Sequence, residues 1–427
     1  MRVWAMMMTG LAMLAPSLAR AAPFDVDHAT ALYLAVLSPA ARARSDAYFD
    51  GAIWLNMVST IVTLLICWLI ARSGVLVRVR DRMRRGGWRP WTIMLSIAAL
   101  FLLCLTLLNL PWSIYVDFWR ERRFGLMNQS FFGWLGDQVV VTLLTVVLGA
   151  VLLTVINLVI RSFPRSWWLV GTAVVAAMLA LFALITPVFI TPLFNTYGEL
   201  PAGALRDRIE AMAAANHIPA DHIYVFNASR QSDRISANVS GLGPTVRISL
   251  TDNLVRGTSV PVAAAVVGHE MGHYVLGHVW VGIAGLALVL GLEFWLLSWI
   301  GPRAIIWGGR RRTVRGLDDP AALPVLVGGM TALSLLFMPV VNTLTRRTES
   351  AADAFGLDTV REPDGFALAA MKLSTYRKIA PSALEEALFF DHPSGRTRVH
   401  AAMQWKMDHV PGATEVTPPP LPDPKGP

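Results

Sequence analysis

The chain carries the stretch Val267-Gly268-His269-Glu270-Met271-Gly272-His273, which is an HExxH motif. On a helix, His269 and His273 project from the same face one turn apart, so both imidazoles can bind one metal ion. Glu270 is set to the side, where a water on that metal would lie, and can accept its proton. The motif therefore predicts a catalytic zinc site. The alternative is a pair of histidines satisfied by hydrogen bonds in a polar groove.

A catalytic zinc also needs a third protein ligand and leaves its fourth position to water. The segment from Thr348 to Gly356 offers Glu349 and Asp353, which share one face of an expected helix. One carboxylate can bind the metal while the other orients a ligand histidine. Taken alone, the pair is typical of a solvated acidic helix face. Beside the HExxH motif, we interpret it as part of the same site.

Composition places this site in a membrane protein. Of the 427 residues, 54% are hydrophobic and only 15% are charged, where soluble domains have about 25% charged residues. The two cysteines, Cys67 and Cys104, lie in apolar stretches and indicate neither a disulfide framework nor a cysteine metal site. Six stretches are long enough to cross a bilayer core of about 30 Å. They run from Ala52 to Ile70, Trp91 to Trp112, Val139 to Ile160, Trp167 to Ile190, Val281 to Ile300 and Ala321 to Val341.

Between the fourth and fifth spans lies a more polar segment with mixed secondary structure. Short strands are expected at Ile223 to Phe226 and Val246 to Leu250, followed by a helix around Val262 to Leu276 that carries the HExxH motif. The chain is expected to begin with a signal peptide at residues 1–21 and to end in a disordered proline-rich tail at 411–427. Between them, residues 22–190 form an N-terminal membrane region with four transmembrane helices. Residues 191–410 form a zinc metallopeptidase-type metal-binding domain, which two transmembrane helices at 281–300 and 321–341 interrupt.

The N-terminus and the arginines both predict which side the site faces. Arg2, a short apolar run and the pattern Ala19-Arg20-Ala21 have the layout of a cleavable signal peptide, although a retained seventh helix is the alternative. A cleaved signal and six crossings leave both polar segments outside. Arginine-rich loops after the first and third spans and before the last are assigned to the cytoplasm, which explains most of the net charge of +8 better than nucleic-acid binding does. We therefore expect a bacterial inner-membrane protein whose site faces the periplasm or cell exterior.

Several separated motifs carry a resemblance over most of the chain. In order and spacing they resemble the integral-membrane CAAX prenyl protease family of zinc metallopeptidases. The resemblance implies a mostly α fold, in which a polytopic transmembrane helix bundle encloses a chamber and joins an α+β zincin-type (gluzincin) metallopeptidase domain. The motifs are Phe124-Gly125-Leu126-Met127-Asn128, Pro192-Leu193-Phe194-Asn195, Ser240-Gly241-Leu242-Gly243, HEMGH at His269 to His273, Glu349 with Asp353, and Asp391-His392-Pro393 with Arg398.

The resemblance also implies roles for the metal-binding residues. Carried over by position, His269, His273 and Glu349 bind one zinc ion per chain, Glu270 is the general base and Asp353 holds a ligand histidine. A further histidine, His278, lies five residues after the motif, where it is expected to be an interfacial residue or to support a ligand.

On the substrate side, the resemblance implies that His392 and Arg398 line the site and help to stabilise the tetrahedral oxyanion. The strand that binds the peptide backbone corresponds to Ser236 through Asn238, where Ser236 replaces the asparagine that family members commonly have. Because strand pairing uses backbone groups, peptide binding can survive this change.

Two functions from different classes remain consistent with the sequence. The first is a zinc endopeptidase that cleaves membrane-associated or exported proteins, and the second is a membrane binding or assembly factor that has lost the chemistry. The intact general base Glu270 favours the first. The sequence leaves the substrate open between a prenylated C-terminus, a lipoprotein signal remnant and a misfolded membrane protein, and it leaves the oligomeric state open.

Overall fold

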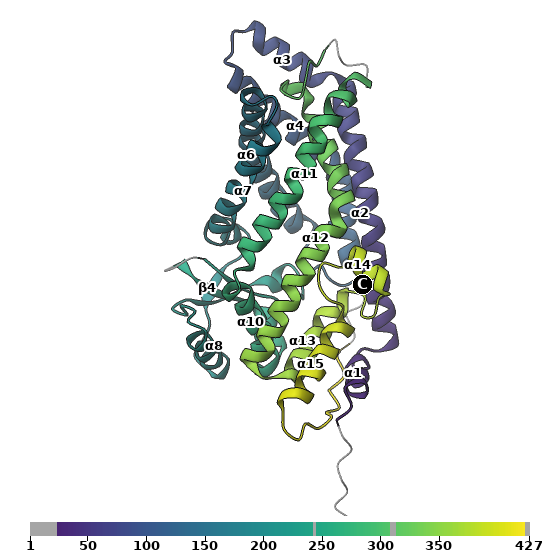
Figure 1. The fold of residues 1–427 in the computed structure, drawn as a ribbon, viewed down its shortest axis with the longest axis vertical. Coiled ribbons are helices and arrows are strands. Elements are labelled where there is room, and N and C mark those ends of the chain that lie inside the picture. Colours follow the sequence, from purple (N-terminus) through teal and green to yellow (C-terminus); the bar gives the residue numbers. More distant parts are fainter. Residues whose placement is uncertain (1–23, 242–244, 308–312, 423–427) are drawn as a thin grey trace, which may run out of the picture.

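The structure, a computed structural model, describes residues 24–241, 245–307 and 313–422. Within these residues six helical segments are long and apolar enough to cross a membrane, which confirms the predicted number. They form the bundle that dominates Figure 1. Their main helices are α2 (Pro39–Ser73), α4 (Pro90–Ser113), α6 (Phe131–Ser162), α7 (Trp167–Ile185), α11 (His278–Trp307) and α12 (Leu323–Val360).

Short helical elements extend or join these long helices. The π-helix η1 (Ile114–Arg120) and α5 (Glu121–Arg123) extend α4, while η2 (Thr186–Ile190) and η3 (Thr191–Leu193) extend α7. The 3-10 turn η6 (Pro320–Ala322) leads into α12. At one end of the bundle, α3 (Val75–Arg85) carries arginines of the loop after the first span, on the opposite end from the sheet (Figure 1).

Helix α12 is longer than the span predicted for it. Its 38 residues correspond to about 57 Å at 1.5 Å per residue, against a bilayer core of about 30 Å. The sequence predicted a span at 321–341 and a separate helix around Glu349, whereas the structure joins the two into one helix. The third metal-ligand candidate therefore stands on the same rigid element as the sixth membrane span.

A small sheet lies at the other end of the bundle. Its strands are β1 (Tyr197–Glu199), β2 (Ile223–Phe226), β3 (Ala237–Ser240) and β4 (Arg247–Thr251), in the order β1-β2-β4-β3. Strands β2 and β4 are parallel, and the other two pairs are antiparallel. In the described part of the chain, β3 is an edge strand with one side unpaired. Both predicted strands are present, the second shifted by one residue.

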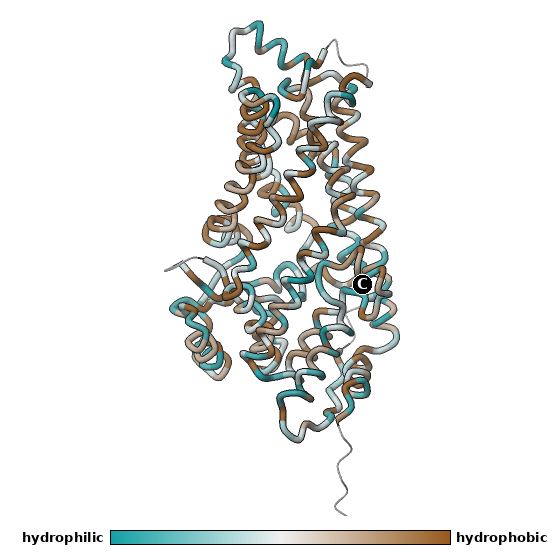
Figure 2. Tube along the Cα trace, viewed as in Figure 1, coloured by the Kyte–Doolittle hydropathy of each residue, from teal (hydrophilic) through white to brown (hydrophobic). Residues whose placement is uncertain are grey.

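Helices from both ends of the chain complete the domain around this sheet. They are α1 (Val26–Leu34), α8 (Ala204–Ala215), α9 (Asp252–Gly257), α10 (Val260–Val275), α13 (Pro363–Leu373), α14 (Ala383–Phe389) and α15 (Gly395–His409), with the 3-10 turns η4 (Ala228–Arg230) and η7 (Ser374–Tyr376). Except for α14, these α-helices contribute apolar residues to one buried cluster with β2, β3 and β4, and a second cluster lies inside the helix bundle. The hydropathy trace shows the same division, with apolar residues concentrated along the long helices (Figure 2).

The two chain ends differ in what the structure describes. The predicted signal peptide lies outside the described residues. The tail was predicted to be disordered over 411–427, and the structure describes it as far as Pro422, without helix or strand. Glu415 contacts His28 at 2.5 Å, Pro418 is buried, and the backbone N–H of Leu421 donates to the carbonyl of Val36 at 2.9 Å. Prolines exclude helix and strand here but still allow the tail to pack against α1.

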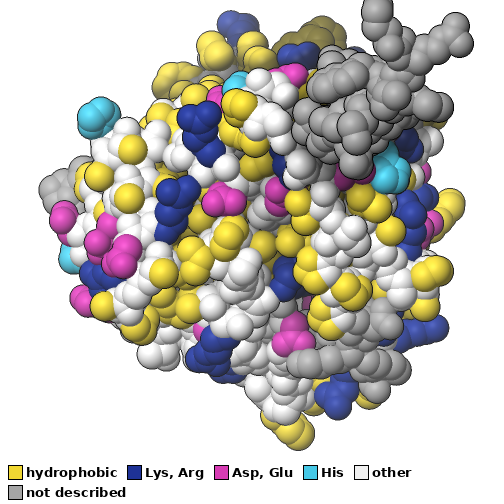
Figure 3. All heavy atoms as spheres, turned by 90° about the horizontal axis from the view of Figure 1, so that it is seen from below, with side chains coloured by type: hydrophobic (Ala, Val, Ile, Leu, Met, Phe, Trp, Pro, Cys, Tyr) yellow, Lys and Arg dark blue, Asp and Glu magenta, His cyan; other side chains and the backbone are white. Residues whose placement is uncertain are grey.

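The end of the molecule that carries the sheet has the surface of a water-exposed domain. Viewed from that end, basic and acidic side chains are interspersed among apolar ones, without a large region of one sign (Figure 3). This mixture gives no indication of a nucleic-acid surface on this face.

Candidate metal centre

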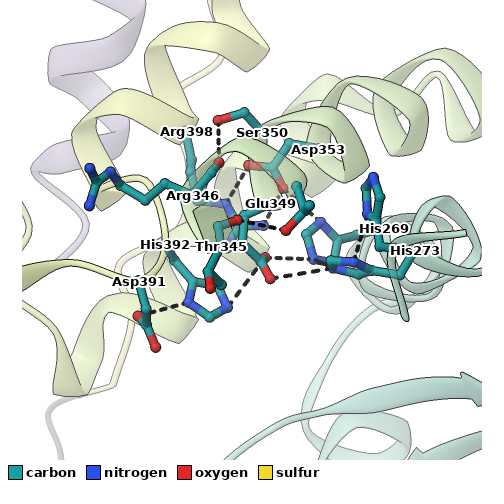
Figure 4. A network of polar contacts seen from close by, with 12 residues as sticks. His269, His273, Thr345, Arg346, Glu349, Ser350, Asp353, Asp391, His392 and Arg398 are labelled. Atoms are coloured by element: carbon teal, nitrogen blue, oxygen red, sulfur yellow. Dashed lines mark hydrogen bonds and ion pairs between the residues drawn. The ribbon is translucent and has the colours of Figure 1, made fainter. Parts of the chain in front are cut away.

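Helix α10 positions the two histidines of the HExxH motif. Pro261 lies in its first turn, where a missing N–H costs nothing, and the helix ends before Gly277, which has a positive φ of 65°. Because His269 and His273 are four residues apart within it, their Nε2 atoms point to the same place and lie 3.1 Å apart (Figure 4).

Small residues bring α12 close enough for its carboxylates to reach these histidines. A Cβ placed on Gly272 would lie 3.1 Å from the backbone of Ala352, and one on Gly356 would lie 3.0 Å from the backbone nitrogen of His269. The two helices thus meet backbone to backbone. This close contact, which larger side chains would prevent, places Glu349 and Asp353 beside α10.

Glu349 completes a set of three ligand atoms. Its Oε2 lies 3.2 Å from Nε2 of His269, and its Oε1 lies 3.5 Å from Nε2 of His273. Two atoms bound to one tetrahedral zinc at 2.0–2.1 Å lie about 3.3 Å apart, so these spacings fit zinc. Oε2 of Glu349 is buried, and imidazole nitrogens of His269 and His392 each lie 3.2 Å from it.

Asp353 holds the far side of the first histidine. Its Oδ1 lies 2.7 Å from Nδ1 of His269, so the carboxylate keeps that nitrogen protonated and leaves Nε2 for a metal. Burial alone would lower the pKa of His269, but Asp353 and Glu349 raise it to about 9. A proton and a metal ion would therefore compete for this imidazole.

Arg398 pairs with the same carboxylate. Its Nε donates to Oδ2 of Asp353 at 2.9 Å and one Nη donates to Oδ1 at 2.6 Å, while only 7% of the residue is exposed. The bidentate geometry of the two planar groups matches, so the guanidinium is paired with Asp353. The role at the oxyanion expected for Arg398 stays a prediction.

His392 enters the site from the loop before α15. Its Nε2 lies 3.2 Å from Oε2 of Glu349, and its Nδ1 lies 2.9 Å from Oδ1 of Asp391 (Figure 4). Arg346, on α12 one turn before Glu349, donates to the carbonyl of Phe390 and so holds this loop in place. Arg346 was not predicted from the sequence. The signal available was its spacing from Glu349, which puts both on one helix face.

Glu270, the predicted general base, follows His269 directly on α10. It is partly buried next to His269, and its charged neighbours are the two motif histidines, Glu349 and His392. Burial raises its pKa, and the neighbouring histidines oppose this shift only in part. A carboxylate with a raised pKa accepts a proton more readily at neutral pH.

His278 supports the second motif histidine, as the sequence allowed. Its Nδ1 lies 2.9 Å from Nδ1 of His273. The turn at Gly277 between α10 and α11 makes this contact possible for a residue five positions away.

The predicted substrate strand lies at the sheet edge beside α10. Ser236 precedes β3, and its carbonyl accepts from the backbone N–H of Thr251 at 3.0 Å. The backbone N–H of Ser236 donates to the side-chain Oγ1 of Thr251 at 3.0 Å. Asn238 is exposed and accepts a contact from Ser240 at 3.4 Å. In the part of the chain that the structure describes, one side of β3 has no partner strand.

Comparisons with known proteins agree with this architecture. The model of Peptidase family M48 matches residues 199–406, and that of the CAAX prenyl protease N-terminal region, described as five membrane helices, matches residues 30–196. In that region the described part of this chain has four membrane-length helical segments.

Individual relatives show the same pattern. A Bacillus subtilis protein named "Uncharacterized metalloprotease YhfN" is 25% identical over 86% of each chain. CAAX prenyl protease 1 of Saccharomyces cerevisiae is 29% identical over 58% of each chain. The crystal structure of S. mikatae Ste24p shares the fold, with a TM-score of 0.60 and 21% identity over 87% of this chain and 98% of that one. With both family models matching consecutive parts of the chain, this multi-pass membrane protein belongs to the CAAX prenyl protease family of metalloproteases, Peptidase family M48.

Proposed function

We propose that this protein is a zinc-dependent endopeptidase that cleaves peptide bonds of membrane-associated or exported proteins. The observation that carries the proposal is the convergence of ligand atoms from His269, His273 and Glu349 at the spacing of tetrahedral zinc. A bound zinc ion would supply Lewis-acid polarisation of the scissile carbonyl and a water with a pKa of about 7. Membership of a metallopeptidase family supports the same chemistry.

The side chains around the three ligands supply the remaining steps. Glu270 accepts the proton of the attacking water and passes it to the leaving amine. His392, whose Nε2 lies beside Glu349, is placed to donate a hydrogen bond to the developing oxyanion. Arg398 acts through Asp353, by holding the carboxylate that orients His269. An extended substrate pairs with the free side of β3 through backbone hydrogen bonds.

Substitution of Glu270 separates this proposal from an inactive assembly factor. Glu270→Gln should keep zinc and lower the rate of peptide cleavage by about 10² to 10⁴, because it removes only the proton acceptor. His273→Ala and Glu349→Ala should each lose zinc, measured by elemental analysis of the purified protein. Glu210→Gln, on the exposed side of α8, is the matched control. Cleavage at the normal rate in Glu270→Gln would contradict the mechanism.

We also propose that the site faces the periplasm or cell exterior. The arginine-rich α3 lies at the opposite end of the bundle from the sheet (Figure 1). Arg161 lies in the last turn of α6, and Arg165 lies in the short turn between α6 and α7. The positive-inside rule assigns that arginine-rich end to the cytoplasm. A site on the other side would have access to exported proteins and to membrane proteins of a bacterial envelope.

A further inference from the structure

A pocket of about 440 Å³ lies beside the second histidine of the HExxH motif. Its walls include Leu184 from the end of α7, Val239 from β3, His273 and Tyr274 from α10, and Trp280 from the start of α11. The volume is within the range of about 300 to 1,000 Å³ for ligand pockets. Because His273 forms part of its wall, the pocket borders the candidate metal centre.

The chemistry of the walls favours an apolar occupant. None of the described residues that line the pocket is an aspartate, glutamate, lysine or arginine. Trp280 remains 49% exposed and Leu184 39% exposed, so both offer apolar surface that an occupant would cover. Burying apolar surface contributes roughly 25 cal/mol of favourable free energy per Å². A charged group would lose its hydration here without gaining an ionic partner.

The position of the pocket along β3 indicates which part of a substrate would reach it. Val239, Ser240 and Gly241, at the C-terminal end of β3, line the pocket. A peptide added antiparallel to the free side of β3 runs in the opposite direction, so its N-terminal part lies over this end. Directly opposed residues share a face of the sheet. A substrate residue opposite Val239 would therefore point its side chain into the pocket.

We propose that this pocket selects substrates by a large apolar side chain on the amino side of the cleaved bond. The inference rests on the proposed endopeptidase function and adds the specificity of the same site. Two variants change the pocket without touching a metal ligand. Ala183→Leu adds volume to its wall, and Trp280→Ala removes the largest side chain from it.

Cleavage of a peptide library by the full-length protein in detergent, with cut sites mapped by mass spectrometry, tests the proposal. The wild type should prefer leucine or phenylalanine over alanine at least tenfold at one position before the cut, and should reject aspartate there. Ala183→Leu and Trp280→Ala should each change this ratio at least tenfold and leave preferences after the cut unchanged. Trp299→Ala, an exposed tryptophan on the distant half of α11, is the control. Active pocket variants with an unchanged ratio would overturn the proposal.

A binding measurement distinguishes failure of this inference from failure of the proposed function. Binding of fluorescent peptides to the Glu270→Gln variant can be measured without turnover. The peptides differ only in having leucine, alanine or aspartate at the selected position. Selective binding of the leucine peptide without cleavage by the wild type would support the pocket and contradict the peptidase. Cleavage without any preference between leucine and alanine would contradict the pocket alone. Zinc content and thermal unfolding of each variant establish that it is folded.

Discussion

Replacement of Arg398 by alanine tests how the candidate metal centre is held together. The guanidinium makes two hydrogen bonds to Asp353, and both residues are buried. Removing one partner of a buried ion pair leaves an uncompensated charge and costs about 3–5 kcal/mol of unfolding free energy. Asp353 also orients His269, and losing such support typically lowers metal affinity by about 10- to 100-fold. Arg398→Ala should therefore be less stable and bind zinc more weakly.

Three measurements on the purified protein separate these effects. Competition with a chelator gives the zinc affinity, thermal unfolding in excess zinc gives the stability, and peptide cleavage at saturating zinc gives kcat. Arg396→Ala, exposed on the same helix α15, should match the wild type in all three. The double variant Asp353→Asn with Arg398→Ala should regain stability relative to Arg398→Ala, because no buried charge is left unpaired.

The opposite pattern would refute this reasoning. An Arg398→Ala protein with unchanged zinc affinity and stability, but with kcat lowered by about 10² to 10³, would behave as if it had lost an oxyanion donor. The bidentate contact with Asp353 would then be incidental to the role of Arg398.

Three further predictions concern packing, pH and orientation. Gly356→Ala should force α12 away from α10, lower the unfolding free energy by about 1–3 kcal/mol and weaken zinc binding. Gly282→Ala, which has open space around it, should have neither effect. Equal chelator competition curves for the two variants would contradict this prediction. Asp353 and Glu349 raise the pKa of His269 to about 9 against the effect of burial. The metal-free protein should therefore lose about 3 kcal/mol of unfolding free energy as pH rises from about 6.5 to 9. Zinc affinity should rise over the same pH range, because the imidazole loses its proton. A thermal midpoint of the metal-free protein that does not fall over this range would contradict the assignment. Finally, in a chain without Cys67 and Cys104, an impermeant thiol reagent added to intact cells should label Thr417→Cys in the tail but not Arg84→Cys on α3; the reverse labelling would overturn the proposed orientation.

The features that the sequence predicted well are local ones. The six spans follow from runs of apolar residues, because crossing a bilayer core requires a minimum length of hydrophobic helix. The pairing of His269 with His273 follows from helix geometry alone. The two short strands were also found, since alternation and turn residues are read within a few positions.

The features that the sequence predicted poorly depend on which elements meet in space. From the residues alone, Glu349 and Asp353 had interchangeable roles, and only the backbone contact of α12 with α10 places one toward Nε2 and the other toward Nδ1 of His269. The pairing of Arg398 with Asp353 was not predicted from the sequence, because the two residues are far apart in the chain. The contacts of the tail with His28 of α1 and with the backbone of Val36 join residues far apart in the chain, so local sequence patterns do not predict them.

By itself, then, the sequence determined that this is a six-span membrane protein with a paired-histidine metal motif, since hydropathy and helical spacing act over a single element. The tertiary structure decided that the sixth span and Glu349 belong to one helix, that Arg398 pairs with Asp353, and that a pocket lies between β3 and Trp280. Backbone hydrogen bonds carry a helix through a change from apolar to polar residues, so hydropathy does not mark its end. The role of a charged side chain is set by the partner that packing brings to it, and that partner is distant in the sequence.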